Sequence, residues 1–353
     1  MKKYIFFVLI STIVYSQDIQ KNQKLDSLAN IFSLEEVTVN ALRAKDNTPV
    51  PFVNITKKDL EKTNLAQDIP TLLKNLPSVV TTSDSGSGIG YSSIMIRGSD
   101  QTRVNVTING VPYNDSESYM SYWVDLPDFA SSIESIQVQR GVGTSTNGPA
   151  AFGGSINILT NAASEKPLFE INNTLGSFNT VKNSIGFSTG FINDKFEFSG
   201  RLSRIKSDGY IDRSGSKLRS YFLQGIFKDE NSLLKILTFA GHEVTDQAWF
   251  GIDSSTLETN RKYNPAGEYY DKMGNTLYYD DQDDNYKQDH YQFHWNQSYE
   301  NGWISNLGLH YTYGRGYWEN YNVGYDDGIS APVDYIDRRW LDNDFYGLLF
   351  SLN

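Results

Sequence analysis

Residues 288–314 read QDHYQFHWNQSYENGWISNLGLHYTYG, and this stretch decides the class of fold. Its first half alternates aromatic with polar side chains: Tyr291, Gln292, Phe293, His294, Trp295 and Asn296. Because successive side chains of a β-strand point to opposite faces, the alternation predicts a strand with one apolar and one polar face. The second half repeats the pattern from Trp303 to Tyr313, after a minimal turn at Asn301-Gly302. The stretch therefore predicts two successive strands of the same kind.

Similar segments follow one another from Pro167 to the end of the chain. We expect strands over residues 167–176, 180–192, 195–206, 217–228, 232–243, 288–300, 303–314 and 340–352. The short connections 193–194, 229–231 and 301–302 alternate with the long connections 207–216, 244–287 and 315–339. Outer-membrane β-barrels have this asymmetry, and their aromatic girdles would explain the 6 Trp, 23 Tyr and 19 Phe. A soluble β-sandwich gives no reason for it, so the pattern favours strands of a transmembrane barrel.

Residues 33–163 have a different texture, with short β-branched runs, glycine-rich turns and one helical stretch, which is typical of a compact α+β domain. Apolar residues at spacings of three and four predict a helix over Thr63–Leu76: Leu65, Ile69, Leu72, Leu73 and Leu76. Asn64 is its expected cap and Pro77 its stop. We also expect strands over residues 36–39, 93–97, 103–108, 133–140 and 154–160, with a tight turn at Asn109-Gly110.

The first sixteen residues are expected to be a secretory signal peptide. Lys2 and Lys3 precede an apolar run from Tyr4 to Tyr15, which is shorter than the roughly 20 residues that a membrane-spanning helix requires. Without these two lysines the net charge of −11 becomes −13, so we expect an exported, acidic mature chain.

Composition excludes several classes of function. The chain has no cysteine, which removes thiolate chemistry and cysteine-based zinc sites. Its 31 Lys and Arg against 42 Asp and Glu argue against a nucleic-acid partner, because phosphate binding needs clustered basic residues. A mean hydropathy of −0.46 fits neither a bundle of membrane helices nor a disordered chain. We find no serine elbow, P-loop or dinucleotide fingerprint, and we expect no enzyme activity and no cofactor.

Four blocks in the α+β region carry a family resemblance. They are SIMIRG at 93–98, VNVTINGVP at 104–112, IESIQVQR at 133–140 and AFGGSINI at 151–158. In order and spacing they resemble the plug domain of TonB-dependent outer-membrane receptors. The resemblance implies a 22-stranded barrel with the plug in its lumen, in the outer membrane of a Gram-negative bacterium. It divides the chain into a signal peptide (1–16), a periplasmic segment (17–44), a plug (45–164) and barrel strands (165–353).

The resemblance also implies a partner in the periplasm. The segment Leu34, Glu35, Glu36, Val37, Thr38 and Val39 occupies the place of the TonB box, which pairs with TonB, the partner of ExbB and ExbD. Such pairing is strand addition, so it requires only an exposed, proline-free segment that favours extended backbone. The alternative is that these residues form an ordinary first strand of the plug.

The chain departs from the resemblance in its length. Eight strands close a barrel that is too narrow to hold a domain of more than a hundred residues. We therefore expect the chain to be the N-terminal part of a longer receptor, interrupted within a strand at Asn353.

Two plug loops match the floor of the external ligand site that the resemblance implies. They are SDSGSGIGYS at 83–92, whose glycines allow close backbone approach, and YNDSESYMSYWVDL at 113–126, which offers aromatic surfaces with polar tips. The expected ligand-binding residues are Ser85, Gly86, Ser87, Gly88, Tyr91, Tyr113, Tyr119, Tyr122 and Trp123. The expected ligand is a metal chelate, an iron–siderophore complex, or a cobalamin-like nutrient. The alternative is that these aromatic residues pack against the inner barrel wall.

Other charged residues are assigned structural roles. Arg97, Arg103 and Arg140 lie in the plug blocks, and we expect them to hold the plug by pairing with carboxylates of the barrel lumen. His290 and His294 would share a strand face about 13 Å apart, too far to share a metal, so we expect no metal site and solvated histidines. The acidic run at 280–284 is read as a solvated face, with calcium binding left open.

Two functions from different classes remain. The first is TonB-dependent uptake of a scarce nutrient by a receptor embedded in outer-membrane lipid. The second is a secreted, soluble β-rich carbohydrate-binding protein or hydrolase, which predicts no lipid-facing apolar belt. Aromatic residues near strand ends, such as Trp303 and Tyr313, favour the first.

The expected length can be tested in the source genome. We expect the reading frame to continue past Asn353 through further alternating segments and to end in an aromatic residue. A stop codon directly after Asn353 would contradict the prediction of a transport function, because no barrel wide enough for the plug could close.

Overall fold

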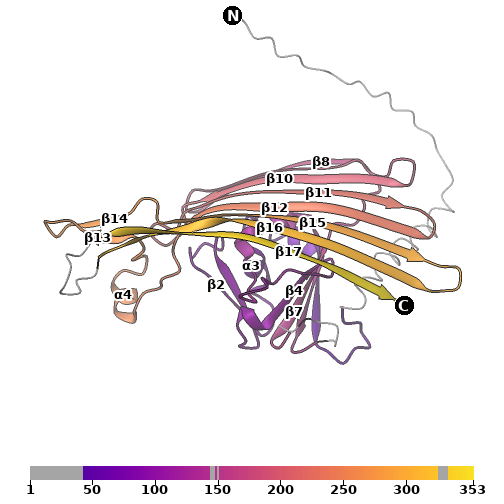
Figure 1. Ribbon diagram of the computed structural model, residues 1–353, viewed down its shortest axis with the longest axis horizontal. Coiled ribbons are helices and arrows are strands. Elements are labelled where there is room, and N and C mark those ends of the chain that lie inside the picture. The colour runs from indigo at the N-terminus through magenta and orange to yellow at the C-terminus, as the bar shows by residue number, and fades with distance from the viewer. Residues whose placement is uncertain (1–42, 144–147, 149–150, 325–332) are drawn as a thin grey trace, which may run out of the picture.

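The computed structural model describes residues 43–143, 148, 151–324 and 333–353. Figure 1 shows a small mixed domain, which we call the plug (residues 43–163), below a broad sheet of long strands, which we call the large sheet (residues 168–352). This arrangement confirms the expected fold class, an α+β domain followed by antiparallel strands of an incomplete barrel. The predicted signal peptide, the segment 34–39 and the strand 36–39 lie outside the described residues.

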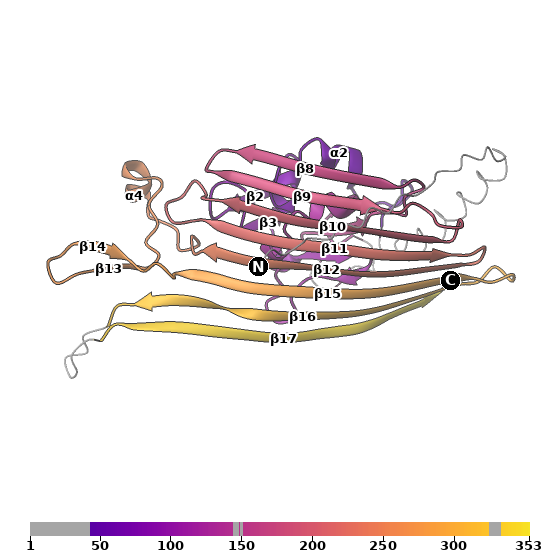
Figure 2. The ribbon, with the colours of Figure 1, turned by 90° about the horizontal axis from the view of Figure 1, so that it is seen from above.

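The large sheet contains all eight predicted strands. They are β8 (Leu168–Gly176), β9 (Thr180–Ser188), β10 (Phe196–Ser207), β11 (Ser216–Lys228), β12 (Ser232–Asp246), β15 (Asp283–Ser298), β16 (Ile304–Asn322) and β17 (Tyr335–Leu352). Each strand pairs antiparallel with the next one along the chain, so the sheet is a meander with β8 and β17 at its edges (Figure 2). The prediction from alternation is therefore confirmed strand by strand.

Four of these strands extend at least three residues further than the alternation indicated. β12 continues to Asp246, β15 begins at Asp283, β16 continues to Asn322 and β17 begins at Tyr335. The added residues pair in register, as in Asp284 with Trp318. Residues such as those at 283–287 are polar on both faces, so they carry no two-residue apolar period. Backbone pairing needs no such period, and the ladder continues beyond the apolar part of the strands.

The two ends of the large sheet differ in their connections. The connections 189–195, 229–231 and 299–303 are short, and we call that side the short-turn end. The connections 208–215, 247–282 and 323–334 leave the opposite side, the long-loop end. The connection 247–282 contains a helix, α4 (Ser254–Thr259), and a small hairpin of β13 (Glu268–Tyr270) and β14 (Thr276–Tyr278), which the sequence prediction left as loop.

The large sheet has two chemically different faces. The face turned away from the plug carries exposed apolar side chains, among them Phe187, Phe198, Leu202, Leu223, Ile236 and Leu309. The face turned toward the plug is largely polar and buried, with side chains such as Ser203, Gln224, Gln292 and His294. One sheet therefore separates an apolar exterior from a polar lumen, as strands of a transmembrane barrel do.

The plug is built on a five-stranded sheet in the order β1-β6-β7-β4-β5. Its strands are β1 (Phe52–Thr56), β4 (Val104–Ile108), β5 (Val111–Pro112), β6 (Ile133–Arg140) and β7 (Gly154–Thr160), and a separate hairpin joins β2 (Val79–Ser83) to β3 (Ser92–Ile96). β4 and β7 pair in parallel, and the other pairs are antiparallel. The four strands predicted over residues 93–97, 103–108, 133–140 and 154–160 are confirmed to within one residue as β3, β4, β6 and β7. The strands β1, β2 and β5 were not predicted.

The predicted helix over Thr63–Leu76 is wrong in extent. Two short helices replace it, α2 (Lys57–Glu61) and α3 (Ile69–Leu73), and the expected cap Asn64 lies between them. Pro70 explains the difference, because proline fits only the first turn of a helix and α3 begins directly before it. Among the described residues, no helix is long and apolar enough to cross a membrane.

The predicted turn at Asn109-Gly110 is confirmed. It joins β4 to β5, with Ile108 opposite Val111. Both turn residues have positive φ, 53° and 82°, as a two-residue hairpin loop requires. The Asn109 side chain accepts hydrogen bonds from the Thr160 backbone and hydroxyl, and it donates to Gln292 on β15, so this turn connects the plug to the wall.

The plug core continues into the large sheet. Phe129 of the plug packs against Phe222 on β11 and Phe239 on β12, with ring centroids 6.3 and 4.9 Å apart. All three are at most 2% exposed and belong to one apolar cluster with the plug strands. The lumen face is therefore apolar only where the plug covers it.

Gly241 on β12 allows this close contact. A Cβ atom at this position would lie 2.0 Å from the carbonyl oxygen of Asp125 and 2.7 Å from Pro127 of the plug. A clash with backbone atoms cannot be relieved by a side-chain rotation, so any larger residue must displace the plug.

We expect Gly241→Ala to destabilise the docked plug by about 1–3 kcal/mol, the usual cost of overpacking a well-packed core. Gly225→Ala on β11 is the matched control, since its Cβ would lie 3.4 Å from Phe198, an ordinary contact. The rate at which a protease cleaves the plug in detergent measures the difference. Equal rates for the two variants would show that the plug does not need this approach.

Candidate functional site

The plug loop 83–92 lies at the long-loop end of the large sheet. Its Ser85 carbonyl accepts hydrogen bonds from the backbone N–H groups of Tyr210 and Ile211, at 2.8 and 3.1 Å. Those two residues belong to the connection 208–215, so a long loop of the sheet fixes the position of the plug loop. Ser85 is buried, and its hydroxyl donates to the Ile89 carbonyl at 2.7 Å.

The glycines of this loop are explained by packing against the large sheet and the plug itself. Gly86 has φ +69°, and a Cβ there would lie 3.0 Å from the Tyr210 ring. Gly90 has φ +99°, and a Cβ there would lie 2.7 Å from the Ser216 hydroxyl. Both positions therefore require glycine without any ligand. Gly88 is buried, while Gly86 is exposed and Ser87 is half-buried.

Tyr91 joins the loop to two carboxylates of the wall. Its hydroxyl donates to Asp284 on β15 at 2.7 Å and to Glu243 on β12 at 3.2 Å. Its ring packs edge-on against Trp249 of the long connection 247–282, with centroids 5.2 Å apart. Asp284 belongs to the acidic run at 280–284, so part of that run is not a solvated face but a contact with the plug.

Asp125 of the plug adds a third carboxylate to this region. It is 2% exposed, and its Oδ1 atom has no hydrogen-bond partner among the described residues. Burial, reinforced by the neighbouring Asp284 carboxylate, raises the pKa of Asp125 well above its ordinary value. The described residues contain no group of three or more ligands arranged to hold a metal ion.

The second predicted loop, 113–126, is only partly open. Tyr119 is 53% exposed, whereas Trp123 is 1% exposed and lies in the plug core. The Tyr113 ring packs against Trp123 and against His290 of β15, and its hydroxyl donates to the Tyr122 carbonyl. Tyr113 therefore follows the alternative expectation, in which the aromatic residues pack against the inner wall.

A polar cavity of about 260 Å³ lies between this loop and the wall. The plug lines it with residues 112–117, and the large sheet lines it from β15, β16 and β17. His290 is one lining residue, 6% exposed and hydrogen-bonded to Thr312, which corrects the expectation of solvated histidines. The cavity therefore lies between the start of the second predicted ligand loop and the barrel wall, and no residue of the loop 83–92 lines it.

The three arginines expected to hold the plug do not do so in the described part of the chain. No ion pair there joins Arg97, Arg103 or Arg140 to a carboxylate of the large sheet. The Arg97 guanidinium lies against Gly141, and that of Arg103 lies 5.7 Å from the Phe152 ring, both within the plug. The Arg140 Nε atom is buried without a hydrogen-bond partner.

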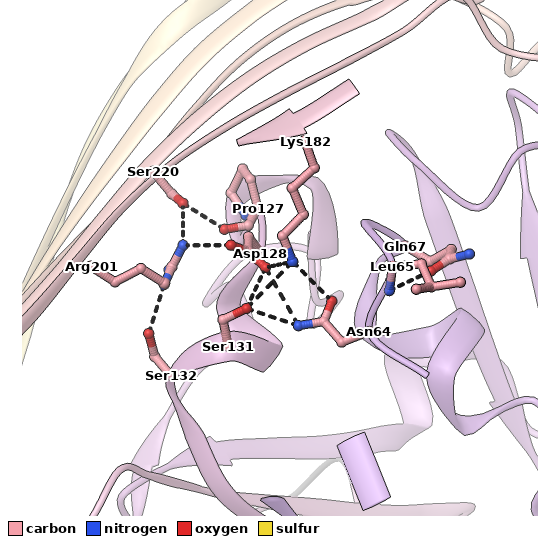
Figure 3. Close-up of polar contacts among 10 residues, drawn as sticks. All are labelled: Asn64, Leu65, Gln67, Pro127, Asp128, Ser131, Ser132, Lys182, Arg201 and Ser220. Atoms are coloured by element: carbon pink, nitrogen blue, oxygen red, sulfur yellow. Dashed lines mark hydrogen bonds and ion pairs between the residues drawn. The ribbon is translucent and has the colours of Figure 1, made fainter. Parts of the chain in front are cut away.

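A carboxylate of the plug holds two cations of the sheet instead, the reverse of the expected polarity (Figure 3). Asp128 forms ion pairs with Lys182 on β9 and, at 3.2 Å, with Arg201 on β10. The three side chains are 0%, 3% and 4% exposed. We call these residues the buried ion triad.

Hydroxyl groups complete the buried ion triad. Ser131 donates to Asp128 at 2.6 Å, and Arg201 donates to the hydroxyls of Ser132 and Ser220 at 2.8 and 3.1 Å. Ser220 on β11 in turn donates to the Pro127 carbonyl at 2.6 Å. Charges removed from water need such partners, since an unpaired buried charge is costly.

The sign of the electrostatic effect follows from these contacts. Burial alone would raise the pKa of Asp128, but Arg201 and Lys182 outweigh it and hold the pKa below its ordinary value. At neutral pH the ionised Asp128 carboxylate therefore stabilises the docked plug relative to its protonated form. One signal in the sequence was missed: Lys182 and Arg201 have the parity of the polar lumen face, where a cation calls for a partner on the plug.

Fold and contacts together define a barrel-type sheet that carries a globular plug on its lumen face. Residues 44–155 match the TonB-dependent Receptor Plug Domain. The chain is 27% identical over 243 residues to the vitamin B12 transporter BtuB of Vibrio cholerae, covering 69% of this chain and 37% of that protein. It is 32% identical over 152 residues to the probable TonB-dependent siderophore receptor PirA of Acinetobacter baumannii, covering 40% of this chain and 20% of that protein.

Solved structures share the fold. FpvA of P. aeruginosa bound to heterologous pyoverdines superposes with a TM-score of 0.63 at 12% identity, covering 89% of this chain and 41% of that one. The copper transporter OprC gives a TM-score of 0.63 at 15% identity, covering 85% and 44%. The chain is thus similar to TonB-dependent receptors, most specifically over the plug at residues 44–155, which confirms the resemblance of the four plug blocks. It spans less than half the length of these relatives.

We expect Asp128→Asn to destabilise plug docking by about 3–5 kcal/mol, because it leaves Lys182 and Arg201 buried without a counter-charge. Asp59→Asn is the control, since its pair with Lys62 is exposed and contributes little. Urea unfolding of the detergent-solubilised protein, followed by plug proteolysis, measures both.

The pH dependence has a defined sign. A carboxylate with a lowered pKa stabilises the folded state above its unfolded value of about 3.9 and loses that contribution as pH falls through the folded value. As the pH falls below about 4, the free energy of plug docking should therefore decrease more in the wild-type protein than in Asp128→Asn. Parallel profiles would contradict the role given to Asp128.

Proposed function

We propose that the chain is the N-terminal part of a longer receptor for TonB-dependent uptake of a scarce nutrient. The observation that carries the proposal is a plug held on the lumen face of barrel strands by the buried ion triad. A further support is that β8 and β17, the two edges of the large sheet, have no outer neighbour among the described strands. Further strands paired to these edges would surround the plug.

The nutrient is an iron–siderophore complex or a cobalamin-like molecule. Relatives named as a vitamin B12 transporter and as a probable siderophore receptor support this class. Ligand binding uses the loops 83–92 and 113–126, where Gly86, Ser87 and Tyr119 offer accessible surface. The cavity of about 260 Å³ is lined by the start of the second loop, including Tyr113, and offers space for part of a docked ligand.

Energy reaches the receptor through the periplasmic segment. Residues 34–39 act as the TonB box and add a strand to TonB, which works with ExbB and ExbD. Strand addition depends on backbone hydrogen bonds, so side-chain changes matter less than the loss of a backbone N–H. The chain acts as a transporter and has no catalytic role.

The soluble alternative loses its main support. A secreted carbohydrate-binding protein or hydrolase predicts no lipid-facing apolar belt, yet the outer face of the large sheet exposes apolar side chains on successive strands, including Phe198, Leu223, Ile236 and Leu309. Such a continuous patch marks contact with lipid or another apolar partner.

The test uses the complete reading frame in a strain that lacks its own receptors. We expect growth on either a ferric siderophore or cobalamin, and Val37→Pro should lower uptake at least tenfold while surface binding at low temperature is retained, because proline removes a ladder N–H. Val37→Ala is the control and should transport normally. Uptake that survives Val37→Pro would disprove the TonB box assignment, and failure on both nutrient classes would disprove the ligand assignment.

A further inference from the structure

Four cations gather on the outer face of the large sheet. In the register of β10 and β11, Arg204 lies opposite Arg219 and Lys206 lies opposite Lys217. All four side chains are exposed and share the face of the apolar belt. We call these four residues the cationic square.

Like charges directly opposite one another destabilise an antiparallel pair. Two carboxylates at the long-loop edge offset part of this charge: Asp208 lies 3.9 Å from Lys206, and Asp246 interacts electrostatically with Lys217. The side chains of Arg204 and Arg219 form no hydrogen bond or ion pair in the described part of the chain. On a chain with a net charge of −11, the two arginines of the cationic square therefore lack an anionic partner among the described residues.

The same register row stays basic across the neighbouring strands. Arg219 lies opposite His242 on β12, His242 lies opposite Lys287 on β15, and Lys287 lies opposite Arg315 on β16. Lys287 is paired with Asp289 at 2.7 Å, so the excess of positive charge is concentrated on β10 and β11.

An apolar hollow of about 470 Å³ lies on the same strands, toward the short-turn end. Its lining includes Phe187, Phe198, Leu223, Phe227, Leu234 and Ile236. Gly225 is a lining residue opposite Phe198, and it has no side chain that would fill the hollow. Leu202 and Tyr221, a directly opposed pair, separate the hollow from the cationic square.

We propose that this surface binds a phosphorylated lipid of the outer leaflet, with its phosphate on the cationic square and an acyl chain in the hollow. Charge complementarity selects the anion, since arginine forks match phosphate oxygens. The positions of the cationic square and the hollow favour a lipid over a free anion, because the square borders the apolar belt that contacts the membrane. The square lies on the long-loop side, which is the external side of outer-membrane barrels.

The site is independent of the nutrient route. β9 and β12 flank the two strands on either side, and the plug lies on the opposite face, as Figure 2 shows from the outer side. Its geometry is therefore set by described residues, and its test does not depend on uptake.

Native mass spectrometry of the receptor, purified in mild detergent and titrated with phosphatidic acid, tests the proposal. We expect Arg204→Gln/Arg219→Gln to weaken retention of the lipid at least tenfold, since each basic residue near an anionic surface contributes a factor of about five. Lys195→Gln/Lys228→Gln is the matched control, because it removes two cations near the short-turn end of the same strands. This control should retain the lipid as the wild type does.

Further variants and probes distinguish a specific lipid site from misfolding, from non-specific lipid binding and from binding of phosphate alone. Arg204→Lys/Arg219→Lys keeps the charge but loses the guanidinium fork, so it should bind the lipid more tightly than the double glutamine variant and less tightly than the wild type, which distinguishes lost charge from lost folding. Gly225→Leu fills the hollow and should weaken phosphatidic acid binding while the cationic square stays intact. Equal retention of zwitterionic phosphatidylcholine, displacement of the lipid by inorganic phosphate at the same concentration, or unchanged binding in the double glutamine variant would each overturn the proposal.

Discussion

The position of the plug depends on the Asp128 carboxylate, which neutralises Lys182 and Arg201 away from water. Each member would be costly alone, because a buried charge without a partner is expensive, so the plug and the sheet require one another. The contacts around the triad are equally close: Gly241 lets the plug backbone touch β12, and Phe129 packs on Phe222 and Phe239. Together they explain why a sheet with a polar face can hold a folded domain.

The side chains of the large sheet form three chemical environments, polar, apolar and basic, on one alternating backbone. Its inner parity is polar and meets the plug, while its outer parity is apolar toward the short-turn end and basic toward the long-loop end. Because strict alternation assigns each parity to one face, a single substitution changes only one of these environments. The cationic square and the buried ion triad therefore use neighbouring residues of β10, Arg204 and Arg201, for separate purposes.

Much of this architecture could be predicted from the sequence, because alternation and turn chemistry are local. The eight strands and the Asn109-Gly110 turn follow from such signals. Contacts between the plug and the wall are not local, so Asp128 was missed and Arg97, Arg103 and Arg140 were assigned to pairs that the described residues do not form. Trp123 illustrates the same limit, since an aromatic residue in a loop sequence carries no sign that it folds into a core.

Two carboxylates three residues apart have opposite electrostatic situations. Asp128 faces two cations, which lower its pKa, whereas Asp125 is buried near Asp284, which raises its pKa. A carboxylate with a raised pKa stabilises docking only while it holds its proton, and that contribution is lost as pH rises through its folded value. Ionised Asp128 thus favours docking, whereas ionisation of Asp125 disfavours it. The stability of the docked plug at neutral pH depends on the difference between these two contributions. A change of charge within the segment 125–128 consequently alters the plug–wall contact.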